Sequence, residues 1–212
     1  MSLKHALFTE SQSKVYAWIF GQPDRSYHLN ELGRLTGLAS ASLQREINRL
    51  TEAGLVISQT VGNQRRISAN MHSPVFGELC GLIRKTMGAE PLLREALLPL
   101  SARIEVAFIY GSVARDTDTA NSDVDLMVVS DAVGLGDILE QCIEIEHQLG
   151  RKINPNCYTV REFRQRLRQP DSFVRSVVAQ PTIGLLGDLN AYTGTGQPAK
   201  DRPTESRKTK SN

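Results

Sequence analysis

Two short apolar runs, each bordered by residues suited to binding phosphates or metals, constrain this chain more than any other feature. Val106–Tyr110 leads directly into Gly111-Ser112, and the pair Asp123 and Asp125 leads directly into Leu126–Val129. Both runs are rich in β-branched residues and are bounded by turn formers, so we predict two β-strands. Residues i and i+2 share a face of a strand, so the two aspartates should point the same way.

The paired aspartates indicate a bound cation. Two neighbouring carboxylates repel each other unless a cation lies between them, and Mg²⁺ or Mn²⁺ prefers oxygen ligands and leaves positions for phosphate oxygens. Gly111 allows close backbone approach, and Ser112 offers a hydroxyl and an N–H. A helical turn that starts at Val113 and includes Arg115 would direct N–H groups and positive charge at an anion. These residues favour a nucleoside triphosphate and a divalent metal. The simpler alternative is a hairpin with an acidic loop.

The same residues carry a family resemblance. Gly111-Ser112, followed by Asp123 and Asp125 in a D-x-D arrangement, resembles the signature of the DNA polymerase β-like nucleotidyltransferases in its minimal form. The resemblance spans about residues 90–188 and implies a small α/β fold with a mixed sheet and metal-aided nucleotidyl transfer. It also implies that Gly111 and Ser112 hold the triphosphate and that Asp123 and Asp125 are the catalytic, metal-binding residues. Asp116 departs from the pattern, which has a small residue after the arginine.

A second departure bears on catalysis. The resemblance implies a third carboxylate on a later strand, but the strand predicted over residues 151–159 carries Asn154 and Asn156 and is interrupted by Pro155. An amide carries no negative charge, so the metal that activates the attacking hydroxyl should bind weakly. We therefore predict nucleotide binding with weak or absent catalysis. Glu144 or Glu146, in the preceding helix, is the alternative source of a third carboxylate.

The first 70 residues show the pattern of three helices and a hairpin. We predict helices over residues 11–21, 29–36 and 40–53, and a tight connection between the last two is typical of a helix-turn-helix. Strands over residues 55–60 and 61–68 should turn at Gly62-Asn63. This order of elements resembles the winged-helix domains of bacterial ArsR- and MarR-like regulators, in which the second helix of the motif enters the major groove of DNA.

The outer face of the third helix and the tip of the hairpin form the predicted surface for double-stranded DNA. Phosphate contacts are expected from the arginines, and base contacts from the amides and one arginine. The predicted DNA-binding residues are Ser42, Gln44, Arg45, Asn48, Arg49, Arg65 and Arg66. The alternative is a domain of the same shape that makes only protein contacts.

Charge is distributed unevenly along the chain, although the formal net charge is only +2. Residues 1–70 carry 8 Lys or Arg against 5 Asp or Glu, whereas residues 89–189 carry 10 against 15. This asymmetry favours two modules with different partners within an α/β (α+β) chain. The expected divisions are a winged-helix domain 1–70, a connecting helix 71–88, a nucleotidyltransferase-like domain 89–189 and a disordered tail 190–212.

The connecting helix carries an apolar stripe that offers a packing surface. Its residues are Val75, Leu79, Leu82 and Ile83. The stripe should pack on the first module or on a second copy of the chain. Because DNA readers of this kind usually pair to span two half-sites, we favour a homodimer.

Farther along the chain, four arginines lie between residues 161 and 168. They form either a phosphate clamp or a solvated basic face, and we favour the basic face.

Several classes of protein are disfavoured. Cys80, Cys142 and Cys157 lack paired spacing, which argues against a disulfide framework or a thiolate zinc site. The N-terminus lacks the pattern of a signal peptide and no run is long enough to cross a bilayer, so a cytoplasmic location without membrane contact is expected.

Three hypotheses about function follow. The first is a DNA-binding transcriptional regulator whose second module senses a nucleoside triphosphate. The second is an active enzyme that transfers a nucleotidyl group to a protein, an RNA or a small molecule. The third is a module that binds a protein partner, as in toxin–antitoxin pairs.

Overall fold

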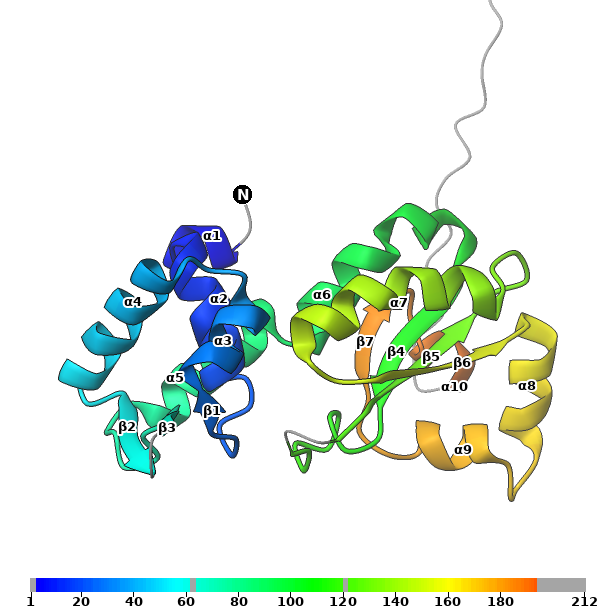
Figure 1. Ribbon diagram of the computed structural model, residues 1–212. Helices are drawn as coiled ribbons and strands as arrows, with labels where there is room; N and C mark the ends of the chain where they lie inside the picture. The colour runs from blue at the N-terminus through cyan, green and yellow to red at the C-terminus, as the bar shows by residue number, and fades with distance from the viewer. Residues whose placement is uncertain (1–2, 62–63, 120–121, 194–212) are drawn as a thin grey trace, which may run out of the picture.

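The computed structural model describes residues 3–61, 64–119 and 122–193, and it contains two groups of elements that lie side by side (Figure 1). Each group has its own sheet and its own apolar core. The α+β class predicted from the sequence is confirmed. No helix among the described residues is both long and apolar enough to cross a membrane.

The N-terminal group contains helices and a three-stranded antiparallel sheet of order β1-β3-β2. Its elements are α1 (Leu3–Leu7), α2 (Glu10–Ile19), β1 (Tyr27–His28), α3 (Leu29–Thr36), α4 (Ser40–Glu52), β2 (Val56–Val61), β3 (Gln64–Ala69) and α5 (Phe76–Met87). Three residues separate α3 from α4, as the sequence predicts for a helix-turn-helix. Strands β2 and β3 pair from Val56↔Ala69 to Val61↔Gln64, and the predicted turn at residues 62–63 lies outside the described residues.

Two details of these helices differ from the sequence prediction. Helix α2 begins before Ser11, because the Thr9 hydroxyl accepts from the Gln12 N–H and the Gln12 side chain accepts from the Thr9 N–H, a capping box. Leu35, which the periodicity places inward, is 36% exposed, while Thr36 is buried and donates to the Leu32 carbonyl. The buried face of α3 is therefore narrower than its apolar pattern indicates.

Helix α5 packs against the N-terminal core through Cys80, Ile83 and Met87. The predicted apolar stripe is only partly used, because Val75 is 47% exposed and Leu82 is 37% exposed. The helix thus joins the first core and still presents an apolar edge outward.

The C-terminal group is built on a mixed four-stranded sheet of order β6-β5-β4-β7. Its elements are α6 (Ala89–Leu97), a 3₁₀ helix (Leu98–Arg103), β4 (Val106–Tyr110), β5 (Val124–Val129), α7 (Leu135–Leu149), β6 (Ile153–Tyr158), α8 (Val160–Arg168), α9 (Phe173–Val178), β7 (Ile183–Leu186) and α10 (Asn190–Thr193). Helices α6 and α7 cover one face of the sheet, and α8 and α9 cover the other. Only β5 and β6 are parallel neighbours.

Strand β6 runs through Pro155, which the sequence analysis expected to interrupt it. The strand is at the edge of the sheet and pairs only with β5, so a residue without an N–H is tolerated there. Residues 190–193, the start of the predicted disordered tail, instead form α10, where Tyr192 packs on Phe163. The rest of that tail, residues 194–212, lies outside the described residues.

Candidate functional site

The predicted strand ends meet at one edge of the C-terminal sheet. Strands β4 and β5 are antiparallel neighbours, and Tyr110 lies opposite Asp125. Gly111 follows with a φ of 77°, and a Cβ at this position would lie 2.2 Å from Asp125 Oδ2. A glycine is therefore required on both conformational and steric grounds. The Gly-Ser turn and the aspartates thus lie together, as the sequence predicts.

The two aspartates are on the sheet face covered by α8 and α9. Val124, Leu126 and Val128 point into the opposite core, so Asp123 and Asp125 share the other face. Asp123 is exposed and Asp125 is half-buried. Across the parallel pairing, Asn154 lies in register with Asp125 and its Nδ2 donates to Asp123 Oδ2 at 3.1 Å. A third polar side chain therefore contacts the pair, but it is an amide.

Asn156, the other candidate position, contacts a different group. Its Nδ2 donates to the Tyr110 hydroxyl at 2.8 Å. Of the two asparagines, Asn154 is the one that bonds an aspartate of the pair, so it occupies the place where the resemblance implies a third carboxylate.

Burial of the site affects proton binding. The pKa of Asp125 is raised, chiefly because burial disfavours the charged form, while the Asn154 hydrogen bond opposes the rise and the Asp123 charge adds to it. The pKa of Tyr110 is raised to about 12 by burial and by the nearby Asp125 charge. Tyr110 therefore stays protonated at neutral pH and is an unsuitable general base. The sequence analysis did not identify Tyr110, because it ends an apolar run and reads as core.

The predicted helical turn after Gly111 forms as a single turn. The Arg115 N–H donates to the Gly111 carbonyl at 3.2 Å and the Thr117 N–H donates to the Ser112 carbonyl at 3.0 Å. Arg115 was predicted to contact phosphate or the acidic loop. Its guanidinium donates to Gln180 Oε1 at 2.8 Å, and its charge opposes the rise in the pKa of Asp125. Arg115 is thus close enough to Asp125 to influence its charge.

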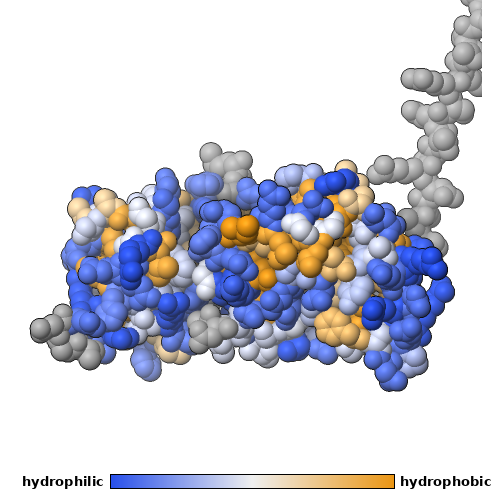
Figure 2. Space-filling view, turned by 45° about the vertical axis from the view of Figure 1, so that its right-hand side comes forward, coloured by the Kyte–Doolittle hydropathy of each residue, from blue (hydrophilic) through white to orange (hydrophobic). Residues whose placement is uncertain are grey.

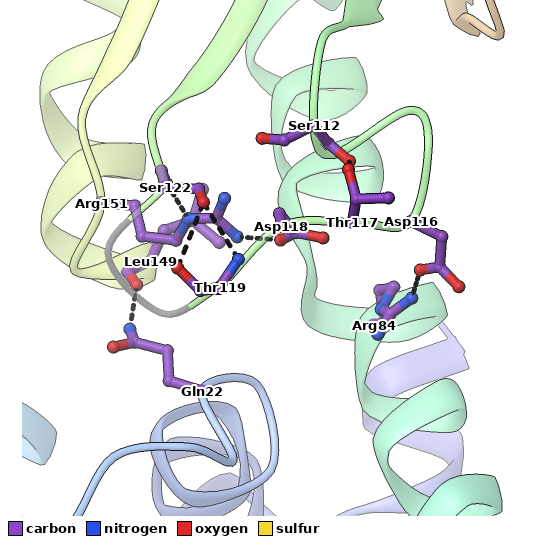
Figure 3. Close-up of polar contacts among 10 residues, drawn as sticks. All are labelled: Gln22, Arg84, Ser112, Asp116, Thr117, Asp118, Thr119, Ser122, Leu149 and Arg151. Atoms are coloured by element: carbon purple, nitrogen blue, oxygen red, sulfur yellow. Dashed lines mark hydrogen bonds and ion pairs between the residues drawn. The ribbon is translucent and has the colours of Figure 1, made fainter.

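The loop between Ser112 and Asp123 is held by an arginine that the sequence analysis did not identify. Arg151 Nε donates to the Ser122 carbonyl at 2.6 Å, and its guanidinium also pairs with Asp118 at 2.7 Å (Figure 3). The Arg151 side chain is only 10% exposed. Because Ser122 immediately precedes Asp123, this arginine fixes the approach of the chain to the aspartate pair. Its position before an apolar strand was the only signal in the sequence.

The same loop contacts the N-terminal group. Asp116 has a positive φ of 59°, which aspartate tolerates better than most residues, and it pairs with Arg84 of α5 (Figure 3). A second contact is nearby, where the buried Gln22 donates to the Leu149 carbonyl at the end of α7. The site loop and the helix next to it are therefore bonded to residues of the other group.

The side-chain oxygens around the aspartate pair indicate whether a metal ion fits this site. Asp123 and Asp125 supply oxygen ligands on one face, and Gly111 leaves space beside Asp125 that a side chain would fill. Among the described residues no group of three or more His, Cys, Asp or Glu could hold a metal. The residues therefore fit one Mg²⁺ or Mn²⁺ held by two carboxylates, with its other ligands from phosphate or water.

Comparisons with known proteins agree with this geometry. Residues 95–178 match the family model described as polymerase beta, nucleotidyltransferase. Residues 95–178 form a nucleotidyltransferase-like domain. Among curated proteins none matches the chain significantly.

Three solved structures are similar to about half of the chain. A crystal structure of a toxin–antitoxin with AMP-PNP aligns with a TM-score of 0.38 and 17% identity, over 50% of this chain and 78% of that chain. A mutant of the toxin–antitoxin MntA–HpeT aligns with a TM-score of 0.36 and 14% identity, over 49% and 77%. Ligand-free NadR aligns with a TM-score of 0.32 and 21% identity, over 47% and 74%.

The alternative third carboxylates of the nucleotidyltransferase-like domain do not reach its site. Helix α7 packs on the sheet face opposite the aspartates. Glu146 accepts from the Ile153 N–H at 2.7 Å, and Glu144 accepts from Gln148 at 3.2 Å. The expectation that either glutamate would replace the missing carboxylate is therefore wrong in this structure. The basic side chains of α8 are exposed, and none forms an ion pair with Asp123 or Asp125; they are Arg161, Arg164, Arg166 and Arg168.

The predicted DNA-binding residues lie on α4 and on the neighbouring hairpin. Asn48 accepts from both Gln44 at 2.8 Å and Arg65 at 3.3 Å, so the helix and the hairpin form one polar surface. Arg45 is exposed and Ser42 is half-buried. Arg66 lies outside this cluster and donates to Ser26 at 2.9 Å.

Arg49 is engaged within the fold. Its guanidinium donates to the buried Glu46 and to the Tyr16 hydroxyl, and the pKa of Arg49 is raised chiefly by the hydrogen bond that it donates to Glu46. The side chain is still half exposed. A structural role thus accompanies the predicted phosphate contact.

Proposed function

We propose that this protein is a DNA-binding transcriptional regulator whose nucleotidyltransferase-like domain binds a nucleoside triphosphate with Mg²⁺ or Mn²⁺, and whose catalysis is weak or absent. The observation that carries the proposal is the bonding of the site loop to the other group of elements. Asp116 of this loop pairs with Arg84 of α5, and α5 packs in the core that supports the helix-turn-helix. A change in the loop on nucleotide binding therefore has a direct route to the DNA-binding elements.

The nucleotide half of the proposal is supported by the arrangement around Gly111. The aspartate pair shares one face, glycine permits the close approach of the backbone, and Ser112 follows at the start of the turn. Bound metal would neutralise the aspartates and the phosphates, while Gly111 and Ser112 would orient the triphosphate. Arg115 would offset further negative charge on the nucleotide.

The weak catalysis is supported by Asn154. This residue contacts Asp123 and lies in register with Asp125, yet it has no charge with which to hold a second metal. The aspartate pair alone suffices to bind one metal with its nucleotide. A site that binds but does not turn over its ligand suits a sensor.

The DNA half is supported by the order of elements in the N-terminal group, which suits a winged helix. In this proposal α3 and α4 are the helix-turn-helix and β2 and β3 are the wing, and Asn48 links Gln44 of α4 to Arg65 of β3. We assign residues 1–70 to this domain and residues 71–88 to the connection. The exposed Leu82 of α5, together with the exposed Met71 and Val75 in the segment before that helix, would provide an apolar surface for a homodimer on two half-sites.

A paired binding measurement tests the proposal. Labelled ATP or GTP is titrated onto the full chain in Mg²⁺ and in EDTA, and a duplex DNA library is titrated at several salt concentrations. We expect nucleotide binding only with metal, weakened by Ser112→Ala without loss of the fold, together with salt-sensitive DNA binding. Equal nucleotide affinity in EDTA and in Mg²⁺ contradicts the metal site, and a lack of DNA binding at low salt contradicts the regulator.

An active nucleotidyltransferase is the second candidate, and the intact pair of Asp123 and Asp125 favours it. The chain is incubated with labelled nucleoside triphosphates, Mn²⁺ and a cell extract, with Asp123→Ala as the control. Label transfer that depends on Asp123 would make this function the leading one. We expect little or none, because the third carboxylate is an amide.

A further inference from the structure

The outward face of α7 carries an apolar stripe that the C-terminal core does not use. Leu135, Leu139 and Ile143 recur every four residues and are 48%, 44% and 59% exposed. Residues at this spacing lie along one side of a helix. The adjoining side of α7 is buried through Ile138 and Cys142. The exposed α7 stripe (Leu135, Leu139 and Ile143) is therefore additional to the residues that hold the helix in place.

This stripe belongs to a broader apolar surface. Figure 2 shows hydrophobic side chains gathered over α6 and α7, with hydrophilic side chains around them. Leu98, in the 3₁₀ helix that follows α6, is 55% exposed. Single exposed leucines are ordinary, but several gathered on one face of a protein indicate a surface that binds another molecule.

The charge beside the stripe is negative. Glu140 and Glu144 each follow a stripe residue in the sequence and are exposed, and α7 contains no Lys or Arg. Within the described part of the chain, no ion pair involves a side chain of α7. The apolar stripe therefore has an acidic border whose two glutamates form no ion pair, although Lys4 and Lys14 line a cavity together with Glu144.

We propose that this face binds an amphipathic helix of a partner protein, with Lys or Arg beside its apolar residues. The stripe runs over nine residues, and the eight rises between Leu135 and Ile143 give about 12 Å at 1.5 Å per residue, which matches the apolar face of two to three helical turns. Basic flanking residues of the partner would lie against Glu140 and Glu144 and give the complex its orientation.

Other occupants fit the charge less well. A second copy that docked through the same face would bring four glutamates together, because a two-fold interface juxtaposes identical patches. An anionic membrane surface would repel the same residues. The proposal goes beyond the proposed function and requires neither nucleotide nor DNA.

The test uses two labelled synthetic helices with the same leucine stripe, one flanked by lysines and one flanked by glutamates. Binding to the full chain is measured by fluorescence anisotropy at two salt concentrations. We expect the lysine peptide to bind at least about tenfold more tightly than the glutamate peptide, with an advantage that shrinks in high salt. Leu139→Ser with Ile143→Ser should weaken lysine-peptide binding by about tenfold or more, since central apolar anchors dominate such contacts.

Two further variants separate the apolar and charged contributions. Glu140→Gln with Glu144→Gln should remove the preference for the lysine peptide while leaving its apolar binding. Val75→Ser, which changes an exposed apolar residue just before α5, should leave peptide binding unchanged. The partner proposal is overturned if neither peptide binds, if both bind equally, or if light scattering shows that the α7 stripe variants convert a dimer to a monomer. Binding of the chain to anionic vesicles that the stripe variants abolish would overturn it in favour of a membrane.

Discussion

At the scale of a single residue, the charged Asp125 carboxylate is unfavourable for folding but is expected to be needed for metal binding. Burial raises the pKa of its carboxyl, so the folded apoprotein holds this proton more tightly than the unfolded chain does. The stability gained from this tighter proton binding is present at low pH and is lost as the pH rises through the folded pKa. Asp125→Asn should therefore raise the melting temperature of the metal-free protein near neutral pH, by an amount that shrinks on acidification, while metal-dependent nucleotide binding is abolished.

Thermal unfolding between pH 4 and pH 8 checks this expectation, with Asp131→Asn as a control for an exposed aspartate away from the pair. The same raised pKa predicts that metal affinity in the wild-type chain declines on acidification at a higher pH than an ordinary aspartate would give. A lower melting temperature for Asp125→Asn at every pH would show that its carboxylate stabilises the fold through hydrogen bonds instead.

Asn154 gives a second residue-scale prediction. Asn154→Asp places a third carboxylate against Asp123 and Asp125, so Mn²⁺ affinity should rise by about tenfold, which corresponds to roughly 1.4 kcal/mol of added attraction. If the missing charge limits catalysis, nucleotidyl transfer should appear in the same variant. Asn156→Asp is the matched control, because Asn156 contacts the Tyr110 hydroxyl and should change Mn²⁺ affinity much less. Equal effects of the two substitutions, by isothermal titration, would contradict the assignment.

At the scale of elements, local patterns in the sequence were informative and contacts between distant elements were not. The strand Val106–Tyr110 and the helix Leu29–Thr36 were predicted with the bounds that the structure has, because apolar periodicity and turn formers define them locally. Strand β1 was missed, since two residues carry no periodicity. The interruption expected at Pro155 was wrong, because tolerance of proline depends on the strand being at an edge, which only the assembled sheet determines.

Arg49 on α4 and the hairpin arginines Arg65 and Arg66 are expected to act differently. Arg65→Ala with Arg66→Ala should weaken DNA binding across all sequences and reduce the salt dependence by about two units of slope, since each phosphate contact contributes roughly one. Arg45→Ala should instead relax the preference between DNA sequences.

Arg49→Ala should lower the free energy of unfolding by about 1–3 kcal/mol, because it leaves the buried Glu46 without a hydrogen bond that it now accepts. Gel shifts at several salt concentrations and chemical denaturation measure the two effects separately. Unchanged stability in Arg49→Ala would remove its assigned structural role.

At the scale of the whole molecule, a few contacts set how the two groups meet. Gly150, at the end of α7, has a φ of 63°, and a Cβ there would lie 2.3 Å from the Trp18 ring of α2. Beside it Gln22 donates to the Leu149 carbonyl, and the next residue, Arg151, bonds the site loop. None of these pairs is visible as a pattern in the sequence, because each residue type is ordinary where it stands. The members of the first two pairs lie more than 120 positions apart, and Arg151 lies 29 positions from Ser122. The route between the proposed DNA and nucleotide sites is a property of the assembled fold.

This arrangement predicts reciprocal coupling between the two ligands. Saturating Mg²⁺ and nucleoside triphosphate should change the DNA affinity of the full chain by a factor within the range of roughly 5–150-fold that allosteric proteins show, and DNA should change nucleotide affinity by the same factor. Arg84→Ala and Asp116→Gly each remove the ion pair between α5 and the site loop, and the glycine also relieves the positive φ. Either should reduce the coupling factor while the affinity for each ligand alone changes little, since an exposed ion pair contributes at most about 1 kcal/mol to stability. The double variant should reduce the coupling factor no further than either single variant does, because both substitutions remove the same contact. Glu90→Ala, which removes an exposed ion pair with Arg94 away from the loop, is the control and should leave the factor unchanged. A coupling factor of one in the wild-type chain, with both ligands bound, would mean that the two sites share a chain but act independently.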